Sequence, residues 1–178
     1  MDKRIGAQLF TVRDYMQTIE DFDTTCKKIS DIGYKIVQVS GSPLDATQMR
    51  KILDKYGLKT MVTHKSYEDF KNNLDGVIEY NKILGSEICG LGMLPLECYK
   101  DDAEFKSFLN YSYVICDEMK KNNLKFGYHN HSWEFAKYKG KTIMDILTDE
   151  TVMCPPKVRL LLRNRFIHLL RDFMQPGD

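Results

Sequence analysis

Histidine and acidic side chains with a spacing suited to chemistry lie in the C-terminal half of the chain. His129 and His131 are two residues apart, and Glu134 follows three residues later. Residues i and i+2 of a strand point to the same face, so the two imidazoles can reach one ligand. Imidazole and carboxylate groups hold divalent cations and also hydrogen-bond the hydroxyl groups of a polyol. The spacing equally suits two imidazoles satisfied within a polar surface, so both interpretations stay open.

Further candidates are one more histidine and two aromatic residues. His64 stands at the end of a predicted strand. Taken alone, a histidine in this position is more simply interpreted as a structural residue than as a functional one. Trp133 and Phe135 flank Glu134. They either pack in the core or wall a site and restrict water, which strengthens electrostatic interactions there. The residue types alone do not separate these two interpretations.

The elements that would position these residues follow an alternating pattern. Hydrophobic periods of two predict strands over residues 5–10, 34–40, 58–64, 87–91 and 125–131, and periods near 3.6 predict helices over 22–32, 49–56, 70–84 and 105–119. Gly33, Gly57 and Gly85 each stand where a predicted helix ends and a strand follows. This rhythm is typical of βα units that build a parallel sheet, with helices on the outside.

In such a fold, ligands bind at the carboxyl ends of the strands. We therefore expect the candidate side chains to converge at one edge of the sheet. The residues at these predicted ends are Thr11 and Arg13, Ser40 and Gly41, His64 and Lys65, Gly92 and Met93, and His129 to Glu134. His64 and the run from His129 are the two positions richest in chemistry.

Composition and charge narrow the class of protein. The chain has 178 residues, of which 43% are hydrophobic and 29% charged, as is usual for a globular protein with a core. Its net charge of +1 predicts no affinity for nucleic acid or for a membrane surface. The first residues lack the apolar stretch of a signal peptide, which predicts a cytoplasmic protein. The length falls short of the roughly 250 residues of an eight-stranded barrel.

Three segments resemble one known family. Ile5–Asp14, Gly57–His64 and especially Tyr128–Phe135 are similar to the sugar phosphate isomerase/epimerase family of xylose isomerase-like TIM barrels. The resemblance covers about residues 4 to 150. It implies a parallel (β/α) barrel of the TIM type and a divalent metal, Mn, Mg, Co or Zn. It also implies a reaction at the adjacent carbonyl and hydroxyl groups of a sugar or polyol.

The resemblance also implies residue roles. Metal ligands would be Glu134 and His168. The remaining roles fall on catalytic positions His64, His129 and His131, and on substrate-binding positions Gln8, Gln38, Asn130 and Trp133. Gln38 departs from the pattern, because the family often has Glu there; the amide leaves a polar contact without a charge.

The end of the chain departs further. Residues 1–151 are expected to form a partial barrel, and residues 152–178 a divergent basic tail within the same domain, with Arg165–Asp172 similar to the family's seventh strand. The sixth-strand Asp ligand and the eighth strand have no counterpart. We therefore expect a truncated or internally deleted member with about five or six of eight βα units, weak metal binding, and possible homodimers covering open strand edges.

Three functions follow as hypotheses. The first is a metal-dependent isomerase or epimerase that transfers a proton next to the carbonyl of a sugar or polyol. The second is a catalytically inactive remnant of that family that binds a polyol. The third, a metal-dependent endonuclease, is opposed by the near-neutral charge and by the lack of a basic, aromatic-interleaved face.

Overall fold

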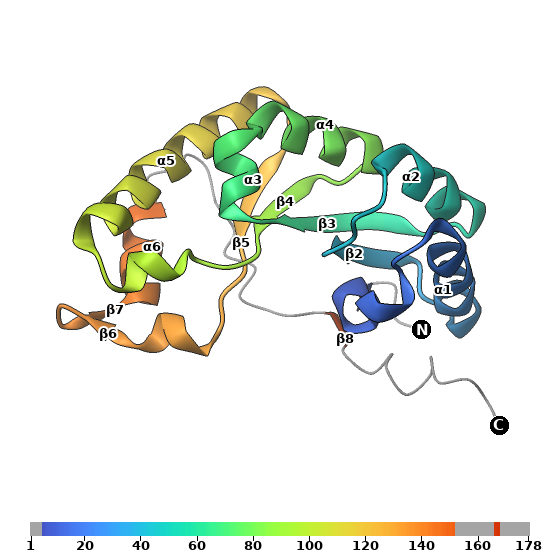
Figure 1. The fold of residues 1–178 in the computed structure, drawn as a ribbon, viewed down its shortest axis with the longest axis horizontal. Helices are drawn as coiled ribbons and strands as arrows, with labels where there is room; N and C mark the ends of the chain where they lie inside the picture. Colours follow the sequence, from blue (N-terminus) through green and yellow to red (C-terminus); the bar gives the residue numbers. More distant parts are fainter. Residues whose placement is uncertain (1–4, 152–165, 168–178) are drawn as a thin grey trace. The chain divides into compact units, whose positions relative to one another are not determined.

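A computed structural model describes residues 5–151 and 166–167 of the chain (Figure 1). The chain divides into two compact units. Unit 1 is formed by the described residues of Met1–His64, Glu79–Glu87 and Arg163–Asp178, and unit 2 by those of Lys65–Ile78 and Ile88–Leu162. No helix among the described residues combines the length and the apolar character needed to cross a membrane.

Unit 1 is built on parallel strands. Its elements are β1 (Gly6–Gln8), the 3₁₀ helix η1 (Leu9–Tyr15), α1 (Ile19–Ile32), β2 (Ile36–Ser40), α2 (Ala46–Lys55), β3 (Lys59–Lys65) and β8 (Phe166–Ile167). The strands follow the order β8-β1-β2-β3, and each neighbouring pair is parallel. One irregularity interrupts the register of β2 and β3: Val37 lies opposite Thr60, but Gln38 lies opposite Val62. Met61 is therefore an extra residue in β3, as in a β-bulge.

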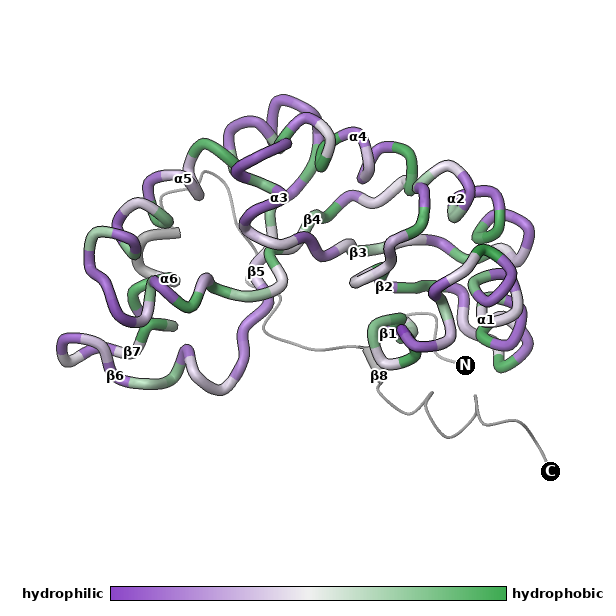
Figure 2. Tube along the Cα trace, in the orientation of Figure 1, coloured by the Kyte–Doolittle hydropathy of each residue, from purple (hydrophilic) through white to green (hydrophobic). Residues whose placement is uncertain are grey.

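Helices α1 and α2 lie along the same side of the unit 1 strands (Figure 1). Thr18 caps the start of α1 by accepting a hydrogen bond from the Asp21 amide, and Gly33 ends it in the left-handed conformation at a φ of 105°. Figure 2 shows hydrophobic stretches in α1 and α2 interrupted by hydrophilic ones. The apolar face of α1 includes Phe22 and Ile29, which join the buried core of the unit.

Unit 2 contains the other parallel pair. Its elements are α3 (Tyr67–Asn72), α4 (Leu74–Leu84), whose last residues belong to unit 1, β4 (Ile88–Leu91), η2 (Leu96–Tyr99), α5 (Asp102–Lys121), β5 (Lys125–Tyr128), η3 (Ser132–Phe135), the hairpin β6 (Lys137–Tyr138) and β7 (Lys141–Thr142), and α6 (Ile143–Thr151). Strands β4 and β5 pair in register from Ile88 opposite Lys125 to Leu91 opposite Tyr128. Aromatic side chains of α5, Phe105 and Phe108, lie in the core of this unit.

The predicted alternation of strands and helices is confirmed, with three corrections. The strand expected over 5–10 ends at Gln8, because Leu9 and Phe10 belong to η1. The helix expected over 70–84 is divided at Asn73, whose side chain accepts from the Gly76 amide and so begins a new helix. The strand expected over 125–131 ends at Tyr128. His129 and His131 are therefore not strand residues, and the i, i+2 argument for a common face was wrong. Of the predicted tail over 152–178, only Phe166–Ile167 is described, and it pairs with β1.

Candidate functional site

A polar cluster lies toward the carboxyl ends of the unit 1 strands. Gln8 and Gln38 are register partners in β1 and β2, and Ser40 and His64 are register partners in β2 and β3. The side-chain nitrogen of Gln38 lies 3.3 Å from Ser40 Oγ and 3.1 Å from the ring nitrogens of His64. A single amide therefore holds the hydroxyl and the imidazole together.

The members of the cluster are held by contacts within the protein. Gln8, Gln38 and Ser40 are buried, whereas His64 is only partly buried. The side-chain oxygen of Gln8 accepts from the Phe10 amide at 3.3 Å, which fixes that side chain. Amide and hydroxyl groups offer both donors and acceptors without a net charge, and the imidazole adds two ring nitrogens, which together suit the hydroxyl groups of a polyol. His64 is the member that a ligand reaches most directly.

A second cluster, in unit 2, surrounds a buried carboxylate. Glu134 is 0% exposed. Its Oε1 accepts from the hydroxyl groups of Tyr128 at 2.7 Å and Tyr99 at 3.0 Å, and its Oε2 accepts from the His131 backbone amide at 2.7 Å. Burial and the hydrogen bond to this carboxylate raise the pKa of Tyr128 far above its usual value; burial and the charge of Glu134 do the same for Tyr99. Both hydroxyl groups therefore stay protonated donors.

The imidazoles lie beside this carboxylate cluster. The rings of His129 and His131 meet edge to face with centroids 4.8 Å apart, and the His131 ring stacks on Trp133 at 4.4 Å and 15°. The two imidazoles therefore lie side by side, as predicted, but a loop and not a strand brings them together. Trp133 is 41% exposed and Phe135 is 56% exposed. Neither aromatic is a core residue.

The metal that the resemblance implies finds no complete ligand set among the described residues. No three His, Cys, Asp or Glu side chains gather there in a way that would hold an ion. Glu134 already accepts three hydrogen bonds. His168, the other predicted ligand, lies outside the described residues. The described donors of unit 2 alone therefore do not fit a metal site.

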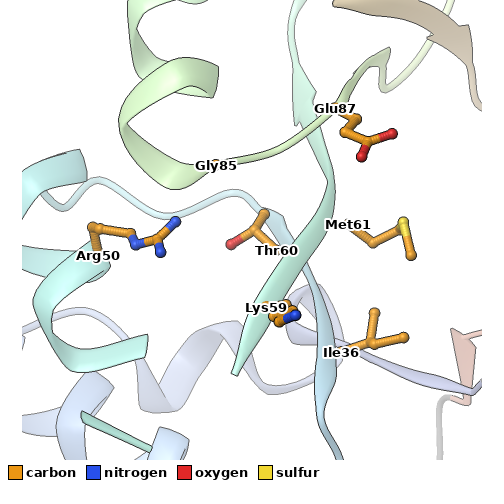
Figure 3. A pocket seen from close by; sticks show the side chains of 7 residues that line it. All are labelled: Ile36, Arg50, Lys59, Thr60, Met61, Gly85 and Glu87. Atoms are coloured by element: carbon orange, nitrogen blue, oxygen red, sulfur yellow. The ribbon is translucent and has the colours of Figure 1, made fainter. Parts of the chain in front are cut away.

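A hollow of about 280 Å³ in unit 1 contains none of the predicted site residues (Figure 3). Ile36 and Lys59, which line it, are the first residues of β2 and β3. The hollow therefore lies at the amino ends of these strands, away from the end that carries Ser40 and His64. Figure 3 shows Arg50 and Thr60 on one side of β3 and Met61 and Glu87 on the other.

The predicted site residues fall into two groups, one in each compact unit. Gln8, Gln38 and His64 lie in unit 1, and His129, Asn130, His131, Trp133 and Glu134 lie in unit 2. Asn130 is a partly buried loop residue between the two histidines. The convergence of the two groups at one edge stays a prediction. Tyr99 and Tyr128 were not identified as site residues; Tyr128 stands in the family-like segment, but no local pattern marks Tyr99.

Comparisons with known proteins agree with this architecture. No protein-family model and no curated protein matches the sequence. Among solved structures, a sugar phosphate isomerase/epimerase from Parabacteroides distasonis is similar, with 19% identity and a TM-score of 0.65 over 84% of this chain and 62% of that one. A xylose isomerase-like TIM barrel protein from Mycobacterium smegmatis, in complex with magnesium, has 12% identity and a TM-score of 0.59, covering 82% and 60% of the two chains.

An AP endonuclease of family 2 from Brucella melitensis is also similar, with 13% identity and a TM-score of 0.53 over 70% of this chain and 54% of that one. The chain thus spans less than two thirds of the length of these structures. Some of these neighbours are sugar-processing enzymes, and one holds magnesium. The predicted resemblance is confirmed at the level of the fold: these residues have the α/β fold of xylose isomerase-like TIM barrels, with fewer βα units than a complete barrel.

Proposed function

We propose that this protein binds a sugar or polyol and belongs, by activity, to the sugar isomerases and epimerases. The observation that carries the proposal is the polar cluster of unit 1, in which Gln38 joins Ser40 and His64. Its position at the carboxyl ends of parallel strands is where folds of this kind bind their ligands. The sugar-processing enzymes among the structural neighbours support the same assignment.

In the proposed reaction, a histidine removes the proton from the hydroxyl-bearing carbon next to the substrate carbonyl. A proton that returns to the other face of the same carbon gives the epimer. A proton that returns to the former carbonyl carbon gives the isomer, and the hydroxyl proton then passes to the former carbonyl oxygen. His64 is the first candidate, because its ring is partly exposed and oriented by Gln38. His129 and His131 are the other candidates. Gln8, Gln38, Asn130 and Trp133 would bind the hydroxyl groups and the apolar face of the sugar.

Metal dependence stays a prediction within this proposal. The resemblance assigns Glu134 and His168 as ligands for a divalent ion, but the described residues give Glu134 three protein donors. A cytoplasmic location and a homodimer also stay predictions, and light scattering of the purified protein tests the latter.

The three hydrogen bonds to the Glu134 carboxylate favour a second candidate function, which is binding of a polyol without turnover. A carboxylate that accepts three hydrogen bonds in a buried position is poorly placed to exchange protons with a substrate. The endonuclease hypothesis shares the fold of a structural neighbour. The net charge of +1 still gives no reason to expect DNA binding.

Hydrogen exchange with solvent tests the proposal without knowledge of the product. The protein is incubated in D₂O with a panel of ketoses and aldoses, with and without phosphate groups and with Mg²⁺ or Mn²⁺. Proton NMR then follows loss of the hydrogen next to the carbonyl. We expect exchange with at least one sugar, reduced about 100-fold or more in His64→Ala.

Lys59→Ala, at the amino end of the same strand, is the matched control and should leave exchange unchanged. Thermal stabilisation by a sugar without exchange would assign the second function. The absence of both exchange and stabilisation across the panel would reject the proposal.

A further inference from the structure

We propose that Glu134 is a positioning residue that fastens the turn carrying His129, His131 and Trp133, and that it does not ligate a metal. The inference rests on the proposed function in one respect, which is that the residues positioned by Glu134 are candidate site residues. Its evidence, and the experiment that tests it, concern the geometry of unit 2 alone.

The carboxylate joins three separate segments of unit 2. Tyr128 is the last residue of β5, Tyr99 is the last residue of η2, and the His131 amide belongs to the loop that leads into η3. All three donate to Glu134, over distances of 2.7 to 3.0 Å. Removing the carboxylate would therefore release the loop from both neighbouring segments at once.

Most of the lone pairs of the Glu134 carboxylate already accept hydrogen bonds from the protein. An ionised carboxylate has about four acceptor positions, two on each oxygen. The two tyrosine hydroxyl groups occupy those of Oε1, and the His131 amide occupies one on Oε2. A metal ion bound through Oε1 would have to displace at least one tyrosine donor.

The order of the turn follows from these contacts. The Glu134 side chain accepts from the backbone of His131, the residue that begins η3, as in a capping box. This bond fixes the backbone from which the His131 ring projects, and that ring stacks on Trp133 and touches His129. A buried atom of the same ring, Nδ1, has no hydrogen-bond partner among the described residues. Stacking on Trp133 and the fixed backbone therefore contribute to the position of the ring.

The chain contains a single tryptophan, Trp133, so tryptophan fluorescence reports on this turn alone. We would compare wild type, Glu134→Gln, Glu134→Ala and Tyr99→Phe by emission wavelength and by acrylamide quenching at one pH. Glu118→Gln, at an exposed carboxylate of α5 paired with Lys121, is the matched control. The same samples are then titrated with Mg²⁺, Mn²⁺ and Zn²⁺.

We expect the quenching constant of Trp133 to rise about twofold in Glu134→Ala, because the turn opens more often. The rise should be smaller in Glu134→Gln, which keeps one acceptor oxygen, and smaller still in Tyr99→Phe, which loses one donor. Glu118→Gln should match wild type. Saturating metal should leave the Trp133 signal of the wild type unchanged.

Two results overturn the proposal. In one, metal shifts the Trp133 signal of the wild type but not that of Glu134→Gln, which identifies a ligand. In the other, Glu134→Gln and Tyr99→Phe both give the wild-type signal, which shows that the carboxylate positions nothing. If Glu134→Ala does not fold, the two conservative variants still decide. None of these measurements involves a sugar, so failure of the proposed activity leaves the outcome readable.

Discussion

Replacing Tyr128 by phenylalanine removes one donor from a buried carboxylate and changes almost nothing else in the side chain. The hydroxyl donates to Glu134 at 2.7 Å, Tyr128 is 5% exposed and Glu134 is 0% exposed. Hydrogen bonds to charged groups contribute about 1.5–3 kcal/mol, and a buried acceptor left without its donor keeps its desolvation cost. We therefore expect Tyr128→Phe to lower the free energy of unfolding by about 2 kcal/mol.

Urea unfolding followed by circular dichroism measures this change. For a chain of this length, about 2 kcal/mol corresponds to a fall of about 4–8 °C in Tm. Tyr34→Phe is the control, because Tyr34 is also buried but its hydroxyl has no hydrogen bond within the described residues. If Tyr128→Phe destabilises the protein no more than Tyr34→Phe does, the carboxylate network does not hold unit 2 together as we argue.

Three further predictions concern other elements. Gly57 and Gly85 both have positive φ, but a Cβ would meet open space at Gly57 and Arg50 Nη1 at 2.3 Å at Gly85. Urea unfolding should show that Gly57→Ala lowers the free energy of unfolding by about 1 kcal/mol. Gly85→Ala should lower it further, because Arg50 must also leave its hydrogen bond to the Leu84 carbonyl. Equal losses would show that Arg50 moves aside without cost. Burial raises the pKa of the Cys26 thiol to about 12 and that of the Cys98 thiol to about 11. Peptide mapping should therefore find that iodoacetamide at pH 8 alkylates neither thiol until the protein unfolds. Prompt alkylation of either thiol in the native protein would contradict the prediction. Hydrogen bonds from Thr142 lower the pKa of Asp145. The stabilisation that the ionised Asp145 gives to the start of α6 is therefore present above the ordinary carboxyl pKa and is lost as pH falls through the lowered value. An NMR titration that gives Asp145 an ordinary pKa would refute this prediction.

The βα pattern could be predicted because it depends on local chemistry. Gly33, Gly57 and Gly85 all adopt the left-handed conformation expected where a helix ends, at φ values of 105°, 63° and 66°. The division of the third helix at Asn73 was missed. Asparagine is tolerated within a helical pattern, and only its bond to the Gly76 amide shows that it begins a new one.

The candidate site was predicted less completely, since long-range contacts leave no local signal. Gln38 and His64 were identified separately, but their contact depends on the pairing of β2 with β3. The predicted strand ran to His131, whereas the chain leaves the strand after Tyr128 because the His131 amide donates to Glu134. Tyr99, which is distant in sequence from Glu134, could not have been found from spacing.

The extra residue in β3 decides which side chain accompanies Gln38. If Met61 were paired regularly and not bulged, the two-residue alternation of the pair would set Thr63 opposite Ser40. The bulge at Met61 thus places a histidine opposite Ser40, where a regular ladder through Met61 would place a threonine. Deleting Met61 would remove the bulge and still leave His64 opposite Ser40, whereas drawing Met61 into the ladder would exchange an ionisable ring for a hydroxyl group at this point.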